Sequence, residues 1–163
     1  MMTIFKKMIV SVLCTCSVLP AFAQTPEYIT ERDIAYYTDS QNNVDAYQKE
    51  RCKLDIYYPK NKKGFATVVW FHGGGLTGGS KELPEALKNK GLCVIGVNYR
   101  LSPMVKVSAC IEDAAAALSW AFNNIQGFNG DSTLIFVSGH SAGGYLTAMI
   151  GLDKSWMAAH NIN

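Results

Sequence analysis

The residues of this chain best suited to chemistry lie in one short motif, Gly139-His140-Ser141-Ala142-Gly143. A serine hydroxyl is a weak nucleophile until a turn presents it to a base and to hydrogen-bond donors for the oxyanion. In a G-x-S-x-G turn the serine is held in a strained conformation between a strand and a helix, and the glycines avoid collisions with both elements. The motif therefore predicts Ser141 as a nucleophile, supported by Gly139 and Gly143.

Two features predict where the oxyanion would be bound. Ala142 opens a predicted helix, where free N–H groups and the helix dipole favour negative charge. Upstream, the sequence His72-Gly73-Gly74-Gly75 follows an apolar run, and backbone without side chains can approach a substrate oxygen closely. We predict N–H donors at Gly74, Gly75 and Ala142, and we expect His72 to brace the loop by hydrogen bonding.

Other interpretations of the glycines and histidines are weaker. A phosphate-binding loop would need the pattern G-x-x-x-x-G-K-S/T, which residues 75–81 do not match. His140 stands beside the serine, where its side chain is expected to point elsewhere, and His160 lies beyond the following helix, where a surface position is expected. In elbow enzymes the order is serine, acid, histidine, so we assign neither His72, His140 nor His160 as the base.

The elements that must position these residues alternate between strand and helix. Residues 53–58 alternate in polarity and suit an outer strand, whereas the continuous apolar run 65–71 suits a strand buried on both faces. This alternation predicts an α/β fold, with a doubly wound, mostly parallel sheet and helices on both faces. Strands are expected over 33–37, 53–58, 65–71, 92–97 and 134–137, and helices over 82–90, 108–124 and 145–152.

Residues 1–23 have the composition of a signal peptide. Lys6 and Lys7 precede an apolar run, and Ala21-Phe22-Ala23 forms a small-x-small cleavage site. The apolar run is shorter than the ~20 residues that a spanning helix needs, so cleavage is favoured over a membrane anchor. We predict cleavage before Gln24 and export to the bacterial periplasm or the extracellular space.

The composition of the remaining domain, residues 24–163, limits the kinds of ligand and partner that it is expected to bind. Loss of the leader lysines leaves 13 basic and 13 acidic residues, and a neutral chain without a dense cationic face argues against nucleic acid. Cys52, Cys93 and Cys110 remain in an oxidising setting, where buried free thiols and a single disulfide are both open. No cysteine pair has zinc-ligand spacing, so neither a metal nor another cofactor is predicted.

Across about residues 50–155 the chain resembles α/β hydrolases of the hormone-sensitive-lipase-like and acetylxylan or feruloyl esterase-like branch. The resemblance implies a carboxylesterase that forms an acyl intermediate on Ser141. It also implies that Arg100 and Asp113 hold the loops beneath the site, the alternative being two ordinary surface charges. Leu76 departs from the aromatic residue that relatives often carry there, which would alter the acyl pocket. The segments that carry the resemblance are Leu54-Asp55-Ile56-Tyr57, His72-Gly73-Gly74-Gly75, Asn98-Tyr99-Arg100-Leu101-Ser102-Pro103 and Gly139-His140-Ser141-Ala142-Gly143-Gly144.

The same resemblance implies that the triad acid and histidine follow the serine, on loops after later strands. Asp153 is too close to Ser141 in sequence to serve as the acid. We therefore expect these residues to be the N-terminal part of a longer enzyme, inactive alone, with the C-terminal strands missing and 134–137 left as an open apolar edge.

The expected function is hydrolysis of small-molecule or carbohydrate-linked carboxylic esters by an exported serine hydrolase without a stable membrane anchor. An amidase or peptidase on the same fold is one alternative, because the acyl-serine chemistry is shared. A non-catalytic protein of the same fold is another, because the acid and the histidine are not identified.

Overall fold

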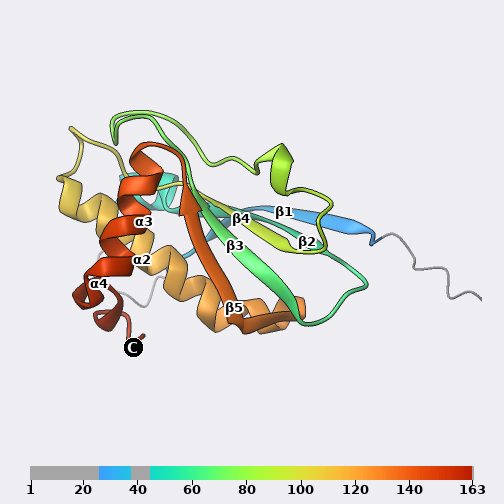
Figure 1. Cartoon of the computed structure of the whole chain (residues 1–163). Coiled ribbons are helices and arrows are strands. Elements are labelled where there is room, and N and C mark those ends of the chain that lie inside the picture. The colour runs from blue at the N-terminus through green and yellow to red at the C-terminus, as the bar shows by residue number, and fades with distance from the viewer. Residues whose placement is uncertain (1–25, 38–44, 163) are drawn as a thin grey trace, which may run out of the picture.

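The computed structural model describes residues 26–37 and 45–162, which form a five-stranded mixed sheet with helices (Figure 1). In the sheet the strands follow the order β1-β2-β4-β3-β5. The last three are parallel to one another, whereas β2 runs antiparallel to both β1 and β4. The predicted leader lies outside the described residues. The strands are β1 (Tyr28–Ala35), β2 (Lys53–Pro59), β3 (Phe65–Phe71), β4 (Cys93–Val97) and β5 (Gly130–Gly139).

Four α-helices and two 3-10 turns complete the described chain. Three of the helices, α2, α3 and α4, pack against one another. In the described part of the chain, no helix combines the length and the apolar character that crossing a membrane requires. The helices are α1 (Ala46–Arg51), α2 (Val107–Asn124), α3 (Ala142–Leu152) and α4 (Lys154–Ala158), and the 3-10 turns are η1 (Glu85–Leu87) and η2 (Ile125–Phe128).

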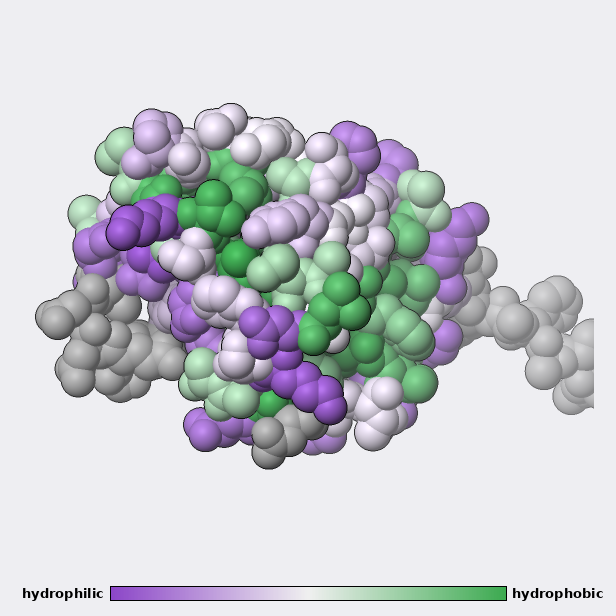
Figure 2. Space-filling model, turned by 60° about the vertical axis from the view of Figure 1, so that its left-hand side comes forward, coloured by the Kyte–Doolittle hydropathy of each residue, from purple (hydrophilic) through white to green (hydrophobic). Residues whose placement is uncertain are grey.

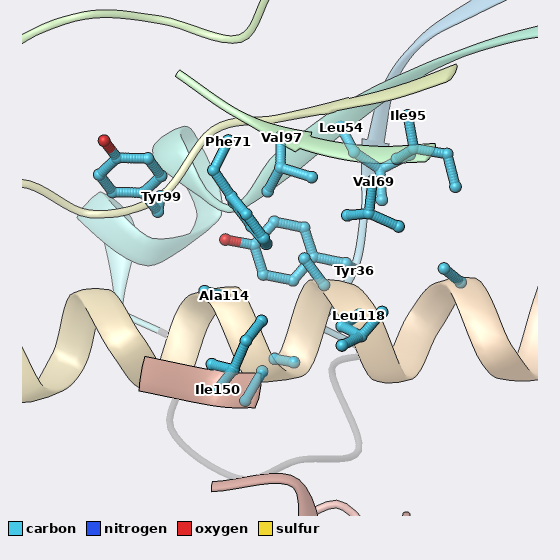
Figure 3. Packing of buried hydrophobic residues seen from close by; sticks show 14 of the residues in the cluster. Tyr36, Leu54, Val69, Phe71, Ile95, Val97, Tyr99, Ala114, Leu118 and Ile150 are labelled. Carbon is cyan, nitrogen blue, oxygen red and sulfur yellow. The ribbon is translucent and has the colours of Figure 1, made fainter. Parts of the chain in front are cut away.

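The main hydrophobic core lies between α2 and one face of the sheet. Figure 3 shows Val69 and Phe71 pointing from β3 towards α2, which presents Ala114 and Leu118. Small residues at consecutive positions of α2 let the helix approach the sheet closely, and each large side chain buried there contributes about 1.5–3 kcal/mol. This packing fixes the ends of β3 and β5, from which the candidate site residues emerge.

The opposite face of the sheet is covered, around Gly96, by an irregular segment and not by an α-helix. Trp70 of β3, Gly96 of β4 and Asp55 of β2 are register partners, so they lie in one row across the sheet. Because side chains alternate along a strand, this row lies on the face opposite Val69 and Phe71. The segment before η1 crosses it, so a loop with one 3-10 turn covers this part of the sheet.

The three cysteines of the described chain are free and buried. Of the two alternatives that the sequence left open, the structure therefore shows free thiols. Burial raises the pKa of Cys93 to about 12, so this thiol stays protonated at neutral pH.

The predicted α/β fold is confirmed as a mixed sheet with helices, but two details differ. Two strand pairs are parallel and two are antiparallel, so the sheet is not mostly parallel. Helices were expected on both faces, whereas the face opposite α2 carries the segment before η1. The helices α2 and α3 begin within three residues of the expected positions.

The helix expected over 82–90 is wrong, since only Glu85–Leu87 forms a 3-10 turn. Pro84 has ψ 127°, an extended conformation, and the chain before it lies flat against the sheet. Tertiary contact overrides helix propensity in this segment.

Four strand predictions also need correction. The first strand spans Tyr28–Ala35 and not 33–37, and it pairs with β2, so β2 is not an outer strand. The residues of β3 alternate between buried and half-buried, so this strand is not fully buried on both faces. The strand β5 extends the expected 134–137 in both directions. It ends the described sheet as the predicted open edge, and Phe136 is 56% exposed.

A buried ion pair ties the chain after β4 to α2. The guanidinium of Arg100 donates two hydrogen bonds to the Asp113 carboxylate, at 2.9 and 2.7 Å, and the Arg100 backbone N–H donates a third at 2.9 Å. Tyr37 OH adds another at 3.0 Å. Asp113 is fully buried, so the two residues are not ordinary surface charges. Their contacts agree with the positioning role that the resemblance implies.

We expect the Asp113→Asn variant to lower the free energy of unfolding by about 3 kcal/mol, because it leaves the Arg100 charge buried without its counter-charge. Chemical denaturation measures this change. Glu85→Gln is the matched control: Glu85 pairs with Lys88 but is 85% exposed, and its loss should cost less than about 0.5 kcal/mol. Equal effects of the two substitutions would contradict this account of the pair.

Candidate active site

Ser141 lies on a sharp turn between β5 and α3. Its backbone has φ 51° and ψ −113°, which is a strained conformation for a residue with a side chain. The turn is closed by a 2.8 Å hydrogen bond from Gly143 N–H to the carbonyl of His140. The conformation and its setting are those of the nucleophile elbow that the motif predicts.

The two flanking glycines are required by close backbone contact. A Cβ at Gly143 would lie well under 3.0 Å from the carbonyl of Phe71, the last residue of β3. A Cβ at Gly139 would lie 2.5 Å from the carbonyl carbon of Gly143. By contrast, the nearest atom to a Cβ at Gly144 would be 3.6 Å away, an ordinary contact. Within the elbow, steric necessity is therefore confined to the two motif glycines and does not extend to Gly144.

The glycine-rich loop after β3 reaches the elbow directly. Gly74 has φ 115° and Gly75 has φ 62°, conformations that favour glycine. The carbonyl of Gly74 accepts hydrogen bonds from the N–H groups of Thr77 and Gly78, at 3.1 and 3.0 Å, so the loop turns back on itself. At Gly73 a Cβ would lie 3.4 Å from the Cβ of Ser141, which places the two loops in contact.

A cavity of about 430 Å³ opens where these two loops meet. Of the predicted oxyanion donors, Gly75 and Ala142 line it, whereas Gly74 is not among its lining residues. Ala142 is the first residue of α3, so its N–H has no partner within the helix and is free to bind an anion. The lining consists of Gly75, Leu76, Val107, Ser141, Ala142 and Tyr145.

Much of this lining is apolar and exposed. Val107 at the start of α2 and Tyr145 in the first turn of α3 are both open to solvent. Neither residue can be identified from the motif, because the motif does not indicate which positions of two separate helices face the serine. Figure 2, which brings the side of α3 and α4 forward, shows hydrophobic surface between polar residues on this part of the molecule.

His72 supports the glycine loop from below. Its Nδ1 lies 2.6 Å from the carbonyl of Gly73, and its ring stacks on Tyr99 with 4.4 Å between centroids. The hydroxyl of Tyr99 donates to the His72 carbonyl at 2.8 Å. Burial lowers the pKa of His72, so the ring is neutral at pH 7. These contacts support the predicted bracing role of His72. They also give a role to Tyr99, which stands in the segment Asn98 to Pro103 and had none assigned from sequence.

The chain after β4 holds the other side of the same loop. Ser102 N–H donates to the carbonyl of Leu76 at 2.8 Å. Arg51, at the end of α1, donates to the carbonyls of Tyr99 and Gly79, both at 3.2 Å. The loop that bears the predicted donors is thus bonded to two segments far from it in sequence.

The other candidate residues do not complete a triad within the described chain. His160 is not at the surface as expected: its side chain is 12% exposed, with Nε2 3.0 Å from a carboxylate oxygen of Glu112. Asp153 accepts hydrogen bonds from Ser155 and so caps α4. Among the described residues, none donates to or accepts from the Ser141 hydroxyl, and no group of three His, Cys, Asp or Glu side chains could hold a metal ion.

Comparison with known proteins identifies the class. Esterase B from Lactobacillus rhamnosis superposes with a TM-score of 0.66 at 27% identity, over 86% of this chain and 45% of that one. The shared fold is that of the α/β hydrolases. Residues 54–161 match the family model described as BD-FAE, and the chain belongs to that family.

Curated relatives bear esterase names. A probable isoprenylcysteine alpha-carbonyl methylesterase of Oryza sativa subsp. japonica is 29% identical over 148 residues, which cover 86% of this chain and 33% of the relative. Fumonisin B1 esterase of Sphingopyxis macrogoltabida is 34% identical over 111 residues, 55% of this chain and 21% of that protein. The chain thus spans a third or less of these two relatives.

The elbow geometry predicts opposite effects for two neighbouring glycines. Gly→Ala in a helix normally stabilises by up to about 1 kcal/mol, and Gly144→Ala should follow this rule because the site has room. Gly143→Ala should instead destabilise by about 1–3 kcal/mol, since the new methyl group meets the Phe71 carbonyl. Thermal unfolding of the two variants compares them directly, and similar melting temperatures would contradict the close contact.

Proposed function

We propose that the protein is a serine hydrolase that cleaves carboxylic esters through an acyl intermediate on Ser141. The observation that carries the proposal is the shared cavity, in which a strained serine faces a free helix N-terminus and a glycine loop. The names of the methylesterase and the fumonisin B1 esterase support carboxylic esters as the substrate class.

In the first step the Ser141 hydroxyl oxygen attacks the ester carbonyl carbon while a base takes its proton. The carbonyl oxygen becomes an oxyanion, which the N–H groups of Gly75 and Ala142 stabilise, with Gly74 as the third predicted donor. Collapse of this intermediate breaks the ester C–O bond. The leaving oxygen takes the proton back from the protonated base and departs as the alcohol, while the acyl group stays on the serine. Water then attacks the acyl carbon, and release of the carboxylic acid restores the hydroxyl.

The base and its acidic partner belong to the same proposal. We propose that a longer protein supplies both from chain that follows the described residues. Two observations support this: the chain spans 45% of the Lactobacillus esterase, and β5 is an open edge of the described sheet, where a further parallel strand could pair.

We expect the protein expressed from its complete reading frame to hydrolyse short p-nitrophenyl esters. Ser141→Ala should lower kcat on the order of 10⁴-fold or more, since no other group can form the acyl intermediate. Matched p-nitroanilides assay the amidase alternative in parallel. If the protein hydrolyses the anilides but not the esters, it is an amidase and not an esterase. If it hydrolyses neither, the result favours a non-catalytic protein.

Residues 1–23 are proposed to be a leader that directs export and is removed. The N-terminal residue of the protein recovered from the periplasm or the medium should then be Gln24, as peptide sequencing or intact mass would show. Recovery of the uncleaved chain from the cell interior alone would contradict export.

A further inference from the structure

The segment that follows the oxyanion loop is fixed to the sheet by two adjacent residues. Lys81 and Glu82 cross the row formed by Asp55, Gly96 and Trp70, which lies on the sheet face opposite α2. We call these two residues the clamp. They lie in an irregular segment, so their position is set by contacts with the sheet and not by a helix or strand of their own.

The first clamp residue forms a nearly buried ion pair. The ammonium nitrogen of Lys81 lies 2.5 Å from a carboxylate oxygen of Asp55 and 2.9 Å from a carboxylate oxygen of Asp33. Side-chain exposure is 14% for Lys81 and 6% for Asp55, so water competes little with this attraction. Burial alone would lower the pKa of Lys81, but its bonds to Asp55 and Asp33 outweigh this effect and raise it.

The clamp also has two polar contacts that specify its orientation. The backbone N–H of Lys81 donates to the side-chain oxygen of Asn98 at 2.5 Å. The indole N–H of Trp70 donates to the carboxylate of Glu82 at 2.9 Å. Between these contacts, Gly96 leaves space for the backbone: a Cβ there would lie well under 3.0 Å from the Glu82 carbonyl oxygen. Strands β2, β3 and β4 thus each supply one residue that contacts the clamp, namely Asp55, Trp70 and Gly96.

A short path joins the clamp to the nucleophile. Gly79 lies two residues before Lys81 and has φ 96°. A Cβ at Gly79 would lie 2.5 Å from both the Gly73 carbonyl oxygen and the His72 Nδ1, so this residue packs against the base of the oxyanion loop. Gly73 in turn contacts His140 and Ser141. A shift of Lys81 would therefore be transmitted to the loop through the intervening backbone.

We propose that Lys81 and Asp55 are a positioning pair that holds the oxyanion loop against the elbow. Gly96 leaves room for the Glu82 backbone, and Trp70 binds the Glu82 side chain. This inference rests on the proposed esterase function for its kinetic consequences. The pair does not touch substrate. It acts on the transition state through the alignment of the Gly75 N–H with that of Ala142, and such alignment affects the oxyanion more than the bound ester.

The first test is kinetic, with Lys81→Met in the full-length protein. Titration with a p-nitrophenyl phosphonate counts the reactive serines, so that kcat refers to correctly folded sites. We expect kcat to fall tenfold or more with KM changed less than threefold, and Lys81→Arg, which keeps the charge, to recover most of the loss. Lys88→Met is the matched control, because Lys88 pairs with exposed Glu85 and should leave both constants unchanged.

A second variant separates position from charge. Gly96→Ala retains every ion pair but pushes the Glu82 backbone away from β4, so it should lower kcat in the same way as Lys81→Met. Glu85→Gln, which changes an exposed carboxylate outside the clamp, is the control and should change kcat less than twofold. Wild-type kcat per titrated site in both Lys81→Met and Gly96→Ala would overturn the proposal.

Hydrogen exchange keeps the test independent of catalysis. Amides of residues 73–79 should exchange at least tenfold faster in Lys81→Met than in wild type, while those of α2 stay unchanged. Unchanged exchange in the loop would overturn the positioning role even if the enzyme is active. If no ester is cleaved but the loop exchange increases as expected, the clamp stands and only the esterase function fails.

Discussion

The structure depends on the close approach between the end of β3 and the start of α3. The Phe71 carbonyl occupies the space where a side chain at position 143 would be, so the turn after β5 can lie directly against β3. The glycine-rich loop leaves β3 at the very next residue. One strand end therefore supports both parts of the candidate site, the nucleophile and the predicted oxyanion donors, and any backbone movement there changes both together.

Two buried charge pairs stabilise this junction from opposite faces of the sheet. On the α2 face, Asp113 binds Arg100 and so fixes the chain after β4, whose neighbouring Tyr99 stacks on His72. On the other face, Asp55 binds Lys81 and fixes the chain beyond the glycine loop. A glycine loop has little conformational preference of its own, because glycine loses more backbone freedom on ordering than other residues. Fixed attachments at both ends compensate for that freedom.

Much of the fold could be predicted from local sequence pattern. Residues 65–71 form β3 as expected, and α2 begins one residue before the expected start, because continuous apolar runs and helical periodicity are strong signals. The elbow could be predicted because its steric requirements leave glycine at fixed positions. The segment 82–90 could not, since its conformation is determined by contacts with strands distant in sequence, and its local composition favours a helix.

The functional environment was less accessible from sequence than the motif itself. Lys81 pairs with Asp55, 26 residues away, and Tyr99 bonds to the carbonyl of His72, 27 residues away, at positions that strand register brings together. His160 pairs with Glu112 because α4 folds back on α2, which no local pattern indicates. Motifs thus indicated the residues that we propose carry the chemistry, whereas the residues that contact and support them could be identified only from the structure.

The most direct test of the central claim is to locate the residue that an ester-like phosphonate modifies. The protein from its complete reading frame would be treated with a p-nitrophenyl phosphonate, digested and analysed by mass spectrometry. We predict a single phosphonyl adduct on Ser141. An adduct on another residue with Ser141 unmodified, in a protein that hydrolyses esters, would contradict the account.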